Sequence, residues 1–262
     1  MAPRPTLVDP ELGPLTDDLL TPDVRVYQRH RGHRFSSDDV ATAHRAYEAR
    51  PDARRVIDLG CGLGSVLLLL AWKLEHATLT GVEAQSGSFE LLRRNVARNA
   101  SVRAIGARVA IVHGDLRETS RNPDWGRRFD LVTGTPPYFP PGAAIDSPDS
   151  QRAHARVEHR GGVEAYVEAG ARVLADEGTL VLCGDARADS RVREAASGAG
   201  LGLVATRSAI PRDGKPALFA VWTLRRGEVD EERREVLLLR DADGRPGEGA
   251  RAMRAFSGFG LD

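Results

Sequence analysis

The residues Asp58-Leu59-Gly60-Cys61-Gly62-Leu63-Gly64 give the clearest indication of fold class in this 262-residue chain. The apolar residues Val56 and Ile57 before them predict the end of a β-strand, and the apolar run 66–72 after them predicts a helix. Three glycines in such a turn permit positive φ angles and a close approach of the backbone to a ligand. Because strand-to-helix turns lie at the carboxyl edge of a parallel sheet, the stretch predicts an α/β protein with a ligand site there.

Strand-like and helix-like patterns alternate on both sides of this turn, which predicts a Rossmann-like, mainly parallel sheet with helices on both faces. Only a turn-rich linker, 210–216, separates the last two strands, so these should be antiparallel neighbours. The seven expected strands are Arg55–Leu59, Thr78–Val82, Arg108–Val112, Asp130–Thr133, Gly178–Cys183, Leu203–Thr206 and Leu218–Leu224, and the expected helices are Ser65–Leu74, Ser88–Asn99, Val163–Leu174 and Arg187–Gly198.

The two ends of the chain fall outside this alternation of strands and helices. Residues 1–20 carry Pro, Asp and Gly, and we expect a mobile or loosely packed arm. Near the other end, the apolar patch Val236–Leu239 and the following turn residues predict a short hairpin and then a loose tail. We therefore divide the chain into an N-terminal arm and covering segment (1–50), a central domain (51–226) and a C-terminal extension (227–262).

The composition is that of a folded soluble protein, with 41% hydrophobic and 28% charged residues. No apolar run is long enough to span a bilayer, and the first residues do not resemble a signal peptide. The two cysteines, Cys61 and Cys183, are expected to be buried thiols in a reducing compartment. We expect a cytoplasmic protein without membrane contact, as a monomer or weak dimer. With 37 basic and 37 acidic residues, any nucleic-acid site must be local.

Three acidic residues follow three successive strands. Asp58 would repel the pyrophosphate of a dinucleotide, but it could face the cationic amino group and sulfonium of S-adenosylmethionine. Glu83 could accept hydrogen bonds from both ribose hydroxyls. Its spacing from the glycine loop also fits an NAD site. Asp115 is placed for the adenine amino group, with the backbone N–H of Leu116 for the ring. Each acid alone could simply cap the next helix, but together they predict an S-adenosylmethionine pocket.

The fourth expected strand runs directly into Thr135-Pro136-Pro137-Tyr138-Phe139. A proline pair usually marks only a stiff turn. At the ligand edge of a sheet, however, prolines fix φ and donate no hydrogen bonds, so carbonyl oxygens can act as acceptors while the aromatic ring stacks on a flat substrate. Two acceptors can hold an NH₂ group in line with a methyl donor, and such positioning needs little covalent help.

This loop resembles the Asn-Pro-Pro-Tyr loop of methyltransferases that act on exocyclic or amide nitrogens. The chain as a whole resembles the bacterial tRNA adenine-N6 methyltransferases that modify the anticodon loop of a valine tRNA. The resemblance implies a class I methyltransferase sheet, mostly parallel with an antiparallel last strand, and an adenine N6 amino group in tRNA or another RNA as target. It spans 28–225, continues over 239–244, and is carried by Gln28–Asp38, Gly81–Gln85, Tyr138–Gly142 with the Arg- and His-containing stretch after it, and Arg212–Ala217.

The motifs and the resemblance together give a set of candidate site residues. The first of these, Thr135, replaces the family's asparagine and offers a hydroxyl that can donate as well as accept. The candidates are Thr135, Pro136, Pro137 and Tyr138 for catalysis, Asp58, Gly60, Cys61, Gly62, Gly64, Glu83, Ala84, Asp115, Leu116, Ser37 and Asp38 for the cofactor, and Phe139, Arg34, Arg152 and His154 for the substrate.

The presence of Thr135 in place of asparagine is compatible with several functions. The target could differ, the enzyme could be slower, or the chain could be a non-catalytic scaffold that binds S-adenosylmethionine or RNA. Methylation of protein glutamine or of a small molecule is the main alternative. The Arg- and His-rich stretch 151–160 could grip a phosphate backbone or be a solvated surface loop. His154 and His159 lack the spacing and companions of a metal site, so we expect no metal.

Overall fold

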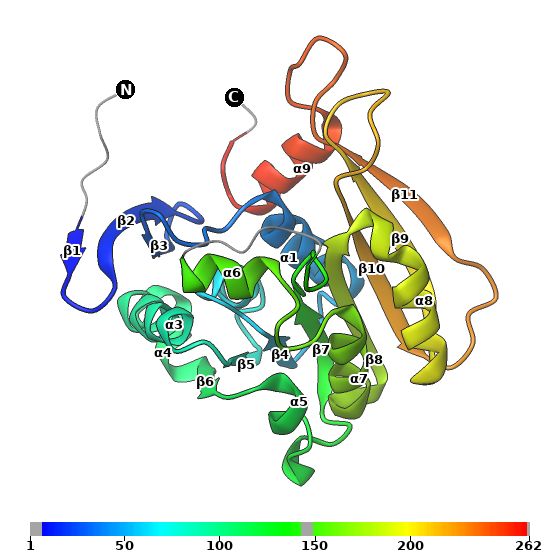
Figure 1. Ribbon diagram of the computed structural model, residues 1–262, viewed down its shortest axis with the longest axis horizontal. Helices are drawn as coiled ribbons and strands as arrows, with labels where there is room; N and C mark the ends of the chain where they lie inside the picture. Colours follow the sequence, from blue (N-terminus) through cyan, green and yellow to red (C-terminus); the bar gives the residue numbers. More distant parts are fainter. Residues whose placement is uncertain (1–6, 143–148, 261–262) are drawn as a thin grey trace.

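The computed structural model describes residues 7–142 and 149–260 (Figure 1). All seven expected strands are present in one sheet, but its strand count is eight rather than seven. The additional strand, β11 (Arg233–Leu238), pairs in parallel with β9 at one edge. The other seven are β4 (Arg55–Leu59), β5 (Thr78–Glu83), β6 (Val109–His113), β7 (Phe129–Gly134), β8 (Leu174–Asp185), β9 (Leu201–Ile210) and β10 (Phe219–Arg226), and the order across the sheet is β11-β9-β10-β8-β7-β4-β5-β6.

The direction of the strands confirms the expected topology. The pairs β4–β5, β5–β6, β4–β7 and β7–β8 are parallel. The last of the seven expected strands, β10, is antiparallel to both β8 and β9, because the 210–216 linker is too short for a crossover helix. The carboxyl ends of β4, β5, β6 and β7 therefore lie at one edge of the sheet.

Helices cover both faces of this sheet (Figure 1). Neighbouring residues of one strand point to opposite faces, so Val56 and Leu131 join one core cluster while Ile57 and Val132 join the other. The expected helices are α2 (Ser65–Lys73), α3 (Ser86–Arg98), α7 (Val163–Val173) and α8 (Asp189–Gly198). The sequence analysis missed α1 (Ser37–Ala49), α6 (Ser150–Arg156) and α9 (Glu248–Phe256), with the one-turn helices α4 (Ile105–Arg108) and α5 (Leu116–Thr119).

The expectation of a loose N-terminal arm was wrong for residues 7–20, and residues 1–6 lie outside the described chain. β1 (Leu7–Asp9), β2 (Gly13–Leu19) and β3 (Arg25–Arg29) form a second, antiparallel sheet. Leu15 of β2 is fully buried, which orders the segment by burying apolar surface. This sheet is blue in Figure 1 and lies beside α3 and α6.

The C-terminal segment contains the expected short antiparallel turn, but the expectation of a loose tail was wrong. The patch 236–239 lies largely in β11, which joins the main sheet, and only one antiparallel bridge, between Arg240 and Pro246, closes the turn after it. Helix α9 buries Met253 and Phe256 against α1. Residues of all three expected segments share one core cluster, among them Leu15, Leu67 and Phe256. The segment boundaries at 50 and 226 stay a prediction.

In residues 7–142 and 149–260, every helix is too short or too polar to traverse a lipid bilayer. The same residues contain no group of three or more His, Cys, Asp or Glu side chains arranged to hold a metal ion.

Candidate active site

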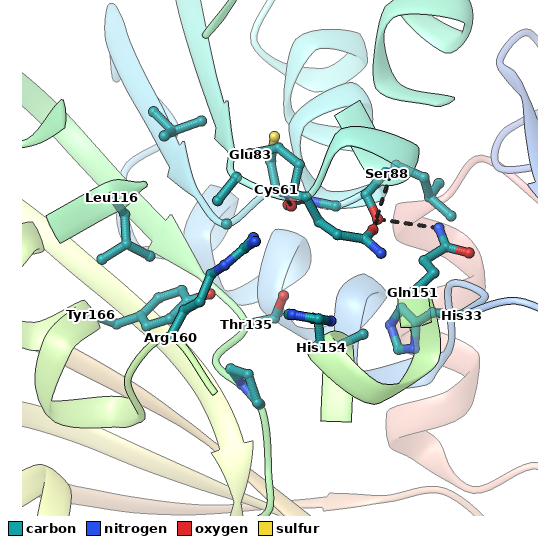
Figure 2. Close-up of a pocket in the computed structure, with 18 of the residues that line it drawn as sticks. His33, Cys61, Glu83, Ser88, Leu116, Thr135, Gln151, His154, Arg160 and Tyr166 are labelled. Carbon is teal, nitrogen blue, oxygen red and sulfur yellow. Dashed lines mark hydrogen bonds between the residues drawn. The ribbon is translucent and has the colours of Figure 1, made fainter. Parts of the chain in front are cut away.

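A pocket opens at the carboxyl edge of β4, β5, β6 and β7, with about 950 Å³ of empty space including its mouth. The glycine loop and the ends of β5, β6 and β7 form its base, and the β3–α1 connection and α6 border it from the other side. Figure 2 shows side chains from these segments around the pocket. Ten of the predicted site residues line it: Gly60, Cys61, Gly62, Glu83, Ala84, Asp115, Leu116, Thr135, Pro137 and His154.

The glycine loop has the positive φ angles that its sequence predicts. Gly60 has φ +64°, and a Cβ there would collide with the hydroxyl of Tyr166. Gly62 has φ +57° and no heavy atom within 4 Å of the position of a Cβ, so its open side faces the pocket. The backbone at Gly62 can therefore approach a bound ligand closely.

Asp58 lies beneath this loop and not in the pocket wall. It is 1% exposed, and its Oδ1 accepts a hydrogen bond from Thr133 Oγ1 at 2.8 Å. Its Oδ2 is buried without a hydrogen-bond partner. Burial raises the pKa of the Asp58 carboxyl to about 7, and the negative charge of Glu83 contributes to this shift. A buried carboxylate oxygen without a partner fits a site for a cationic ligand.

Glu83 fastens the glycine loop to the end of β5. Its Oε2 accepts a hydrogen bond from the Gly62 N–H at 2.9 Å, and its Oε1 accepts one from the Gln85 N–H at 2.6 Å. Burial raises the pKa of its carboxyl, although these backbone hydrogen bonds oppose the shift. Each carboxylate oxygen keeps further acceptor capacity, so Glu83 can still receive ligand hydroxyls in the pocket.

Asp115 combines the two alternatives that the sequence left open, because it lines the pocket and also caps α5. Its carboxylate accepts hydrogen bonds from the backbone N–H and the guanidinium of Arg117. The hydrogen bond from the Arg117 side chain lowers the pKa of Asp115, against the effect of burial. Asp115 therefore presents a carboxylate that stays ionised near neutral pH.

Asp39 lines the pocket and was missed by the sequence analysis, which chose Ser37 and Asp38 on the same segment. Asp39 accepts hydrogen bonds from the Ser65 hydroxyl and the Ser36 N–H, both at 2.9 Å. Burial and the neighbouring charge of Asp38 raise the pKa of its carboxyl to about 7. The pattern Ser36-x-x-Asp39 is a capping-box signal that could have located the start of α1.

Other missed residues lie around the same pocket. Tyr166, from α7, packs its hydroxyl against Gly60, and Arg160 follows α6. The positive charge of Arg160 acts on both Glu83 and Asp115. Arg160 belongs to the Arg- and His-rich stretch 151–160, whereas no local motif marks Tyr166. The remaining lining residues that were missed are His33, Phe35, Leu63, Ser65, Val82, Gln85, Ser88, Gly114, Gln151, Ala155 and Gly161.

The proline-containing loop places Thr135 and Pro137 in the pocket wall, while Pro136 is buried behind them. Tyr138 is not among the lining residues. Its hydroxyl donates to Asp38 Oδ2 at 2.7 Å, and burial raises the pKa of this hydroxyl. Phe139 donates its N–H to the Arg156 carbonyl at 2.9 Å. Tyr138 and Phe139 thus fasten the loop to α1 and α6, and stacking of Tyr138 on a substrate stays a prediction.

Two of the predicted substrate residues, Arg34 and Arg152, form contacts with other residues of the protein at the border of the pocket. Arg34 pairs with the buried Asp18 at 2.8 Å. Burial opposes ionisation of Asp18, but hydrogen bonds from Thr16, Gln28 and Arg34 outweigh it and lower the pKa of the carboxyl. Arg152 donates to the Gly32 carbonyl at 3.3 Å. Their contact with a substrate stays a prediction, as does that of Phe139.

Besides Asp58 and the Tyr138 partner Asp38, two further predicted cofactor residues lie away from the lining. Gly64 has φ +95° and caps the start of α2, where a Cβ would press on Leu92. Ser37 begins α1 and is exposed. Their roles toward a cofactor therefore stay predictions.

Comparison with known proteins places the chain among methyltransferases. The family model described as "Methyltransferase small domain" matches residues 35–191. A release factor glutamine methyltransferase from Geobacter sulfurreducens is 36% identical over 47% of this chain and 37% of its own length. A tRNA1(Val) (adenine(37)-N6)-methyltransferase from Porphyromonas gingivalis is 31% identical over 48% of each chain. The match therefore spans less than half the length of these two relatives.

Longer but weaker similarities agree with this placement. A tRNA1(Val) (adenine(37)-N6)-methyltransferase from a Shewanella strain is 26% identical over 81% of this chain and 86% of its own length. A solved structure described as a predicted O-methyltransferase from Agrobacterium tumefaciens has a TM-score of 0.61 at 19% identity, covering 84% of this chain and 96% of its own. At this identity the structure shows the shared fold only. The chain belongs to the methyltransferase small domain family, whose members use S-adenosylmethionine as methyl donor.

Proposed function

We propose that this chain methylates the N6 amino group of an adenine in tRNA, with S-adenosylmethionine as the methyl donor. The observation that carries the proposal is the placement of Thr135 and Pro137 in the same pocket as Gly62, Glu83 and Asp115. A methyl donor and a flat amine substrate would meet there. The relatives named tRNA1(Val) (adenine(37)-N6)-methyltransferase, one of them similar over most of both chains, support the choice of target.

The residues of the pocket suit the three parts of the donor. Glu83 would accept the ribose hydroxyls, and Asp115 with Leu116 would receive the adenine ring. The carboxyl group of Asp39 would face the cationic end, and that of Asp58 would act on it from beneath the glycine loop; each carries a raised pKa that a nearby positive charge would lower. Bound S-adenosylmethionine supplies an electrophilic methyl group, and the chain contributes its orientation toward the target.

Exposed arginines at the border of the pocket would bind the RNA backbone. Arg31 lies on the β3–α1 connection, Arg156 on α6, and Arg160 just after α6, and all three are exposed. Phosphate contacts of this kind supply most nonspecific affinity, so a local cluster suffices although the whole chain has zero formal charge. A target base in a tRNA loop would have to swing out of its stack to enter the pocket.

Methylation of a protein glutamine is the second candidate. It is favoured by the 36% identity to the Geobacter release factor glutamine methyltransferase, although that match covers only 37% of the relative. A glutamine side chain presents the same NH₂ group beside a carbonyl, so the same loop could hold it. Thr135, in place of the family's asparagine, does not by itself distinguish the two targets.

The deciding experiment measures cofactor binding and then methyl transfer. We expect S-adenosylhomocysteine to bind in calorimetric titration and labelled methyl groups to enter unmodified tRNA, more weakly as salt rises. Label in total protein alone would favour methylation of protein glutamine. Label in a small-molecule extract alone would favour a small-molecule substrate. Binding without transfer to any fraction would identify a scaffold, and absence of binding would reject the proposal altogether.

A pair of substitutions at Tyr138 tests the loop. We expect Tyr138→Ala to abolish transfer, because both the ring and the hydrogen bond to Asp38 are lost. The matched variant Tyr138→Phe removes only the hydroxyl and should keep more than a tenth of the activity if the ring stacks on the target base. Equal losses in both variants would mean that the tyrosine acts through its bond to Asp38, and full activity of Tyr138→Ala would reject either role.

A further inference from the structure

The pocket has a second polar wall facing the cofactor residues. In Figure 2, Cys61 and Glu83 lie along one side of the pocket, and Thr135 and His154 lie along the other. Thr135 follows β7, whereas His154 comes from α6, 19 residues further along the chain. The structure thus brings an imidazole to the wall where the target group would enter.

Helix α6 is held firmly enough to fix the place of this imidazole. Asp149 caps the helix by accepting the Arg152 N–H at 3.0 Å, and it also pairs with Arg29 of β3 at 2.8 Å. Gln151 is 2% exposed and donates to the Ser88 hydroxyl of α3 at 3.2 Å. At the other end, the Arg156 carbonyl accepts the N–H of Phe139. The helix is therefore tied to β3, to α3 and to the loop that carries Thr135.

Thr135 alone is a weak replacement for an asparagine. Its hydroxyl offers acceptor capacity, but it lacks the amide carbonyl, which accepts without also donating. A neutral imidazole nitrogen is a stronger acceptor and can also take up a proton near neutral pH. We infer that His154 is a catalytic residue, which accepts a hydrogen bond and then the proton from the target nitrogen beside Thr135. This inference rests on the proposed N-methyltransferase function.

The donor, the target nitrogen and His154 together account for every bond, electron pair and proton in this step. The target nitrogen forms a bond to the methyl carbon as the carbon–sulfur bond of the donor breaks, and the electron pair of that bond returns to sulfur. The nitrogen, which has gained a bond, releases its N–H proton to His154. The protonated imidazole then returns this proton to water. The site needs no metal or oxidant for this reaction.

Several other titratable groups face the same space and have to be separated from His154 in a pH profile. These are His33 from the β3–α1 connection, Asp39 from α1, Cys61 from the glycine loop, Glu83 from β5, Asp115 before α5, Arg160 after α6 and Tyr166 from α7. On its own segment, His154 is flanked by Arg152 and Arg156, and its ring lies 5.4 Å from the ring of His159. The variants below leave all of these groups in place, apart from the His159 control.

The test compares His154→Ala and His154→Asn with the matched control His159→Ala, which removes the neighbouring exposed imidazole. We expect His154→Ala to lower kcat about 100-fold, as loss of a general base does, with S-adenosylhomocysteine affinity unchanged. His154→Asn should recover part of the rate without the rise of kcat through the titration range of an imidazole. His159→Ala should behave as wild type. In a Thr135→Asn background, His154→Ala should lower kcat less than 10-fold.

A readout independent of turnover is the affinity for an unmodified tRNA transcript in the presence of S-adenosylhomocysteine, which His154→Ala should weaken and His159→Ala should not. An unchanged pH profile and kcat in His154→Ala would overturn the role of His154 while leaving the proposed function intact. Absence of transfer by the wild-type protein to every acceptor would instead reject the proposed function, and the inference with it. A loss of S-adenosylhomocysteine binding in both His154 variants would overturn the inference in favour of a structural role.

Discussion

At the scale of single residues, the effect of Gly62 on the backbone turn can be distinguished from its effect on ligand binding by comparison with a second glycine outside the pocket. Gly62 and Gly214 have φ +57° and φ +72°, and neither has a heavy atom within 4 Å of a Cβ position. Only Gly62 lines the pocket, whereas Gly214 lies in the exposed β9–β10 turn. The two glycines therefore form a matched pair.

We expect Gly62→Ala and Gly214→Ala to reduce the free energy of unfolding equally, by about 1 kcal/mol each, because both force alanine into the left-handed region. Gly62→Ala should also weaken S-adenosylhomocysteine binding more than 10-fold, since its Cβ enters the space that the ligand needs. Urea unfolding and calorimetric titration measure the two effects. Equal affinities in both variants would place the ligand elsewhere.

Asp58 predicts a dependence of stability on pH. The pKa of its carboxyl is raised by burial from 3.8 to about 7, so between these values the folded state binds more protons than the unfolded state. The contribution of Asp58 to stability is therefore fully present below about pH 4 and is lost as the pH rises through 7. Asp58→Asn keeps an acceptor for Thr133 and should become more stable relative to wild type as the pH rises from 5 to 8.

Asp115→Asn is the control for this measurement. The pKa of Asp115 is lowered, mainly by the hydrogen bond from Arg117, so this carboxyl is ionised in both states from pH 5 to 8. Its effect on the free energy of unfolding should then be the same throughout this range. Denaturant unfolding at several pH values provides the data, and a flat difference between Asp58→Asn and wild type would contradict the raised pKa.

At the scale of elements, an asparagine of α3 and the asparagine that caps its C-terminal end form hydrogen bonds with the backbone of β3, as a neighbouring strand would. Asn95 accepts the Tyr27 N–H at 2.7 Å and donates to the carbonyls of Tyr27 and Leu63. Asn99, one turn later, exchanges hydrogen bonds with the backbone of Arg25. The N-terminal sheet, α3 and the glycine loop are thus joined by amide groups and not only by apolar packing.

We expect Asn95→Ala to lower the free energy of unfolding by about 3 kcal/mol, because it leaves the buried carbonyl of Leu63 and the partly buried N–H and carbonyl of Tyr27 without this partner. The control Arg93→Ala removes an exposed side chain from the same helix and should change stability by less than about 0.5 kcal/mol. Chemical denaturation compares the two. Similar small effects would mean that water replaces the asparagine.

At the scale of the whole molecule, both ends of the chain converge on α1 and α2. The indole of Trp72 in α2 donates to Asp23 at 3.0 Å, and a Cβ at Gly258 would touch its ring. The Phe256 ring lies 5.0 Å from that of His44 and 5.9 Å from that of Tyr47. The terminal segments therefore contribute to the same core as the central sheet.

This arrangement predicts that the C-terminal helix unfolds together with the rest of the chain. Phe256→Ala should lower the free energy of unfolding by about 4 kcal/mol, as a large truncation in a core does. Phe259→Ala, three residues on and only half-buried, should cost about 1 kcal/mol or less. A single transition seen by both circular dichroism and tryptophan fluorescence is expected, and a separate early transition in Phe256→Ala would contradict it.

Local sequence patterns were enough to predict several features of the sheet and of the pocket. Strand periodicity fixed β4 to β10, and parallel strands necessarily bring their carboxyl ends to one edge, so Glu83 and Asp115 could be placed with the glycine loop beforehand. The short linker before β10 likewise required the strand reversal. Helix α1 was within reach through its capping box but was overlooked.

Which side chains line the pocket and which hold the protein together depends on contacts between distant segments. Arg34 and Asp18, Tyr138 and Asp38, and Asp149 and Arg29 are partners far apart in the sequence, and spacing along the chain does not encode such pairs. The segment 233–238 acquired its strand structure by pairing with β9, whereas 248–256 carries a strong helical amphipathic pattern that was overlooked. Pairing with a distant strand, rather than local propensity, set the conformation of 233–238.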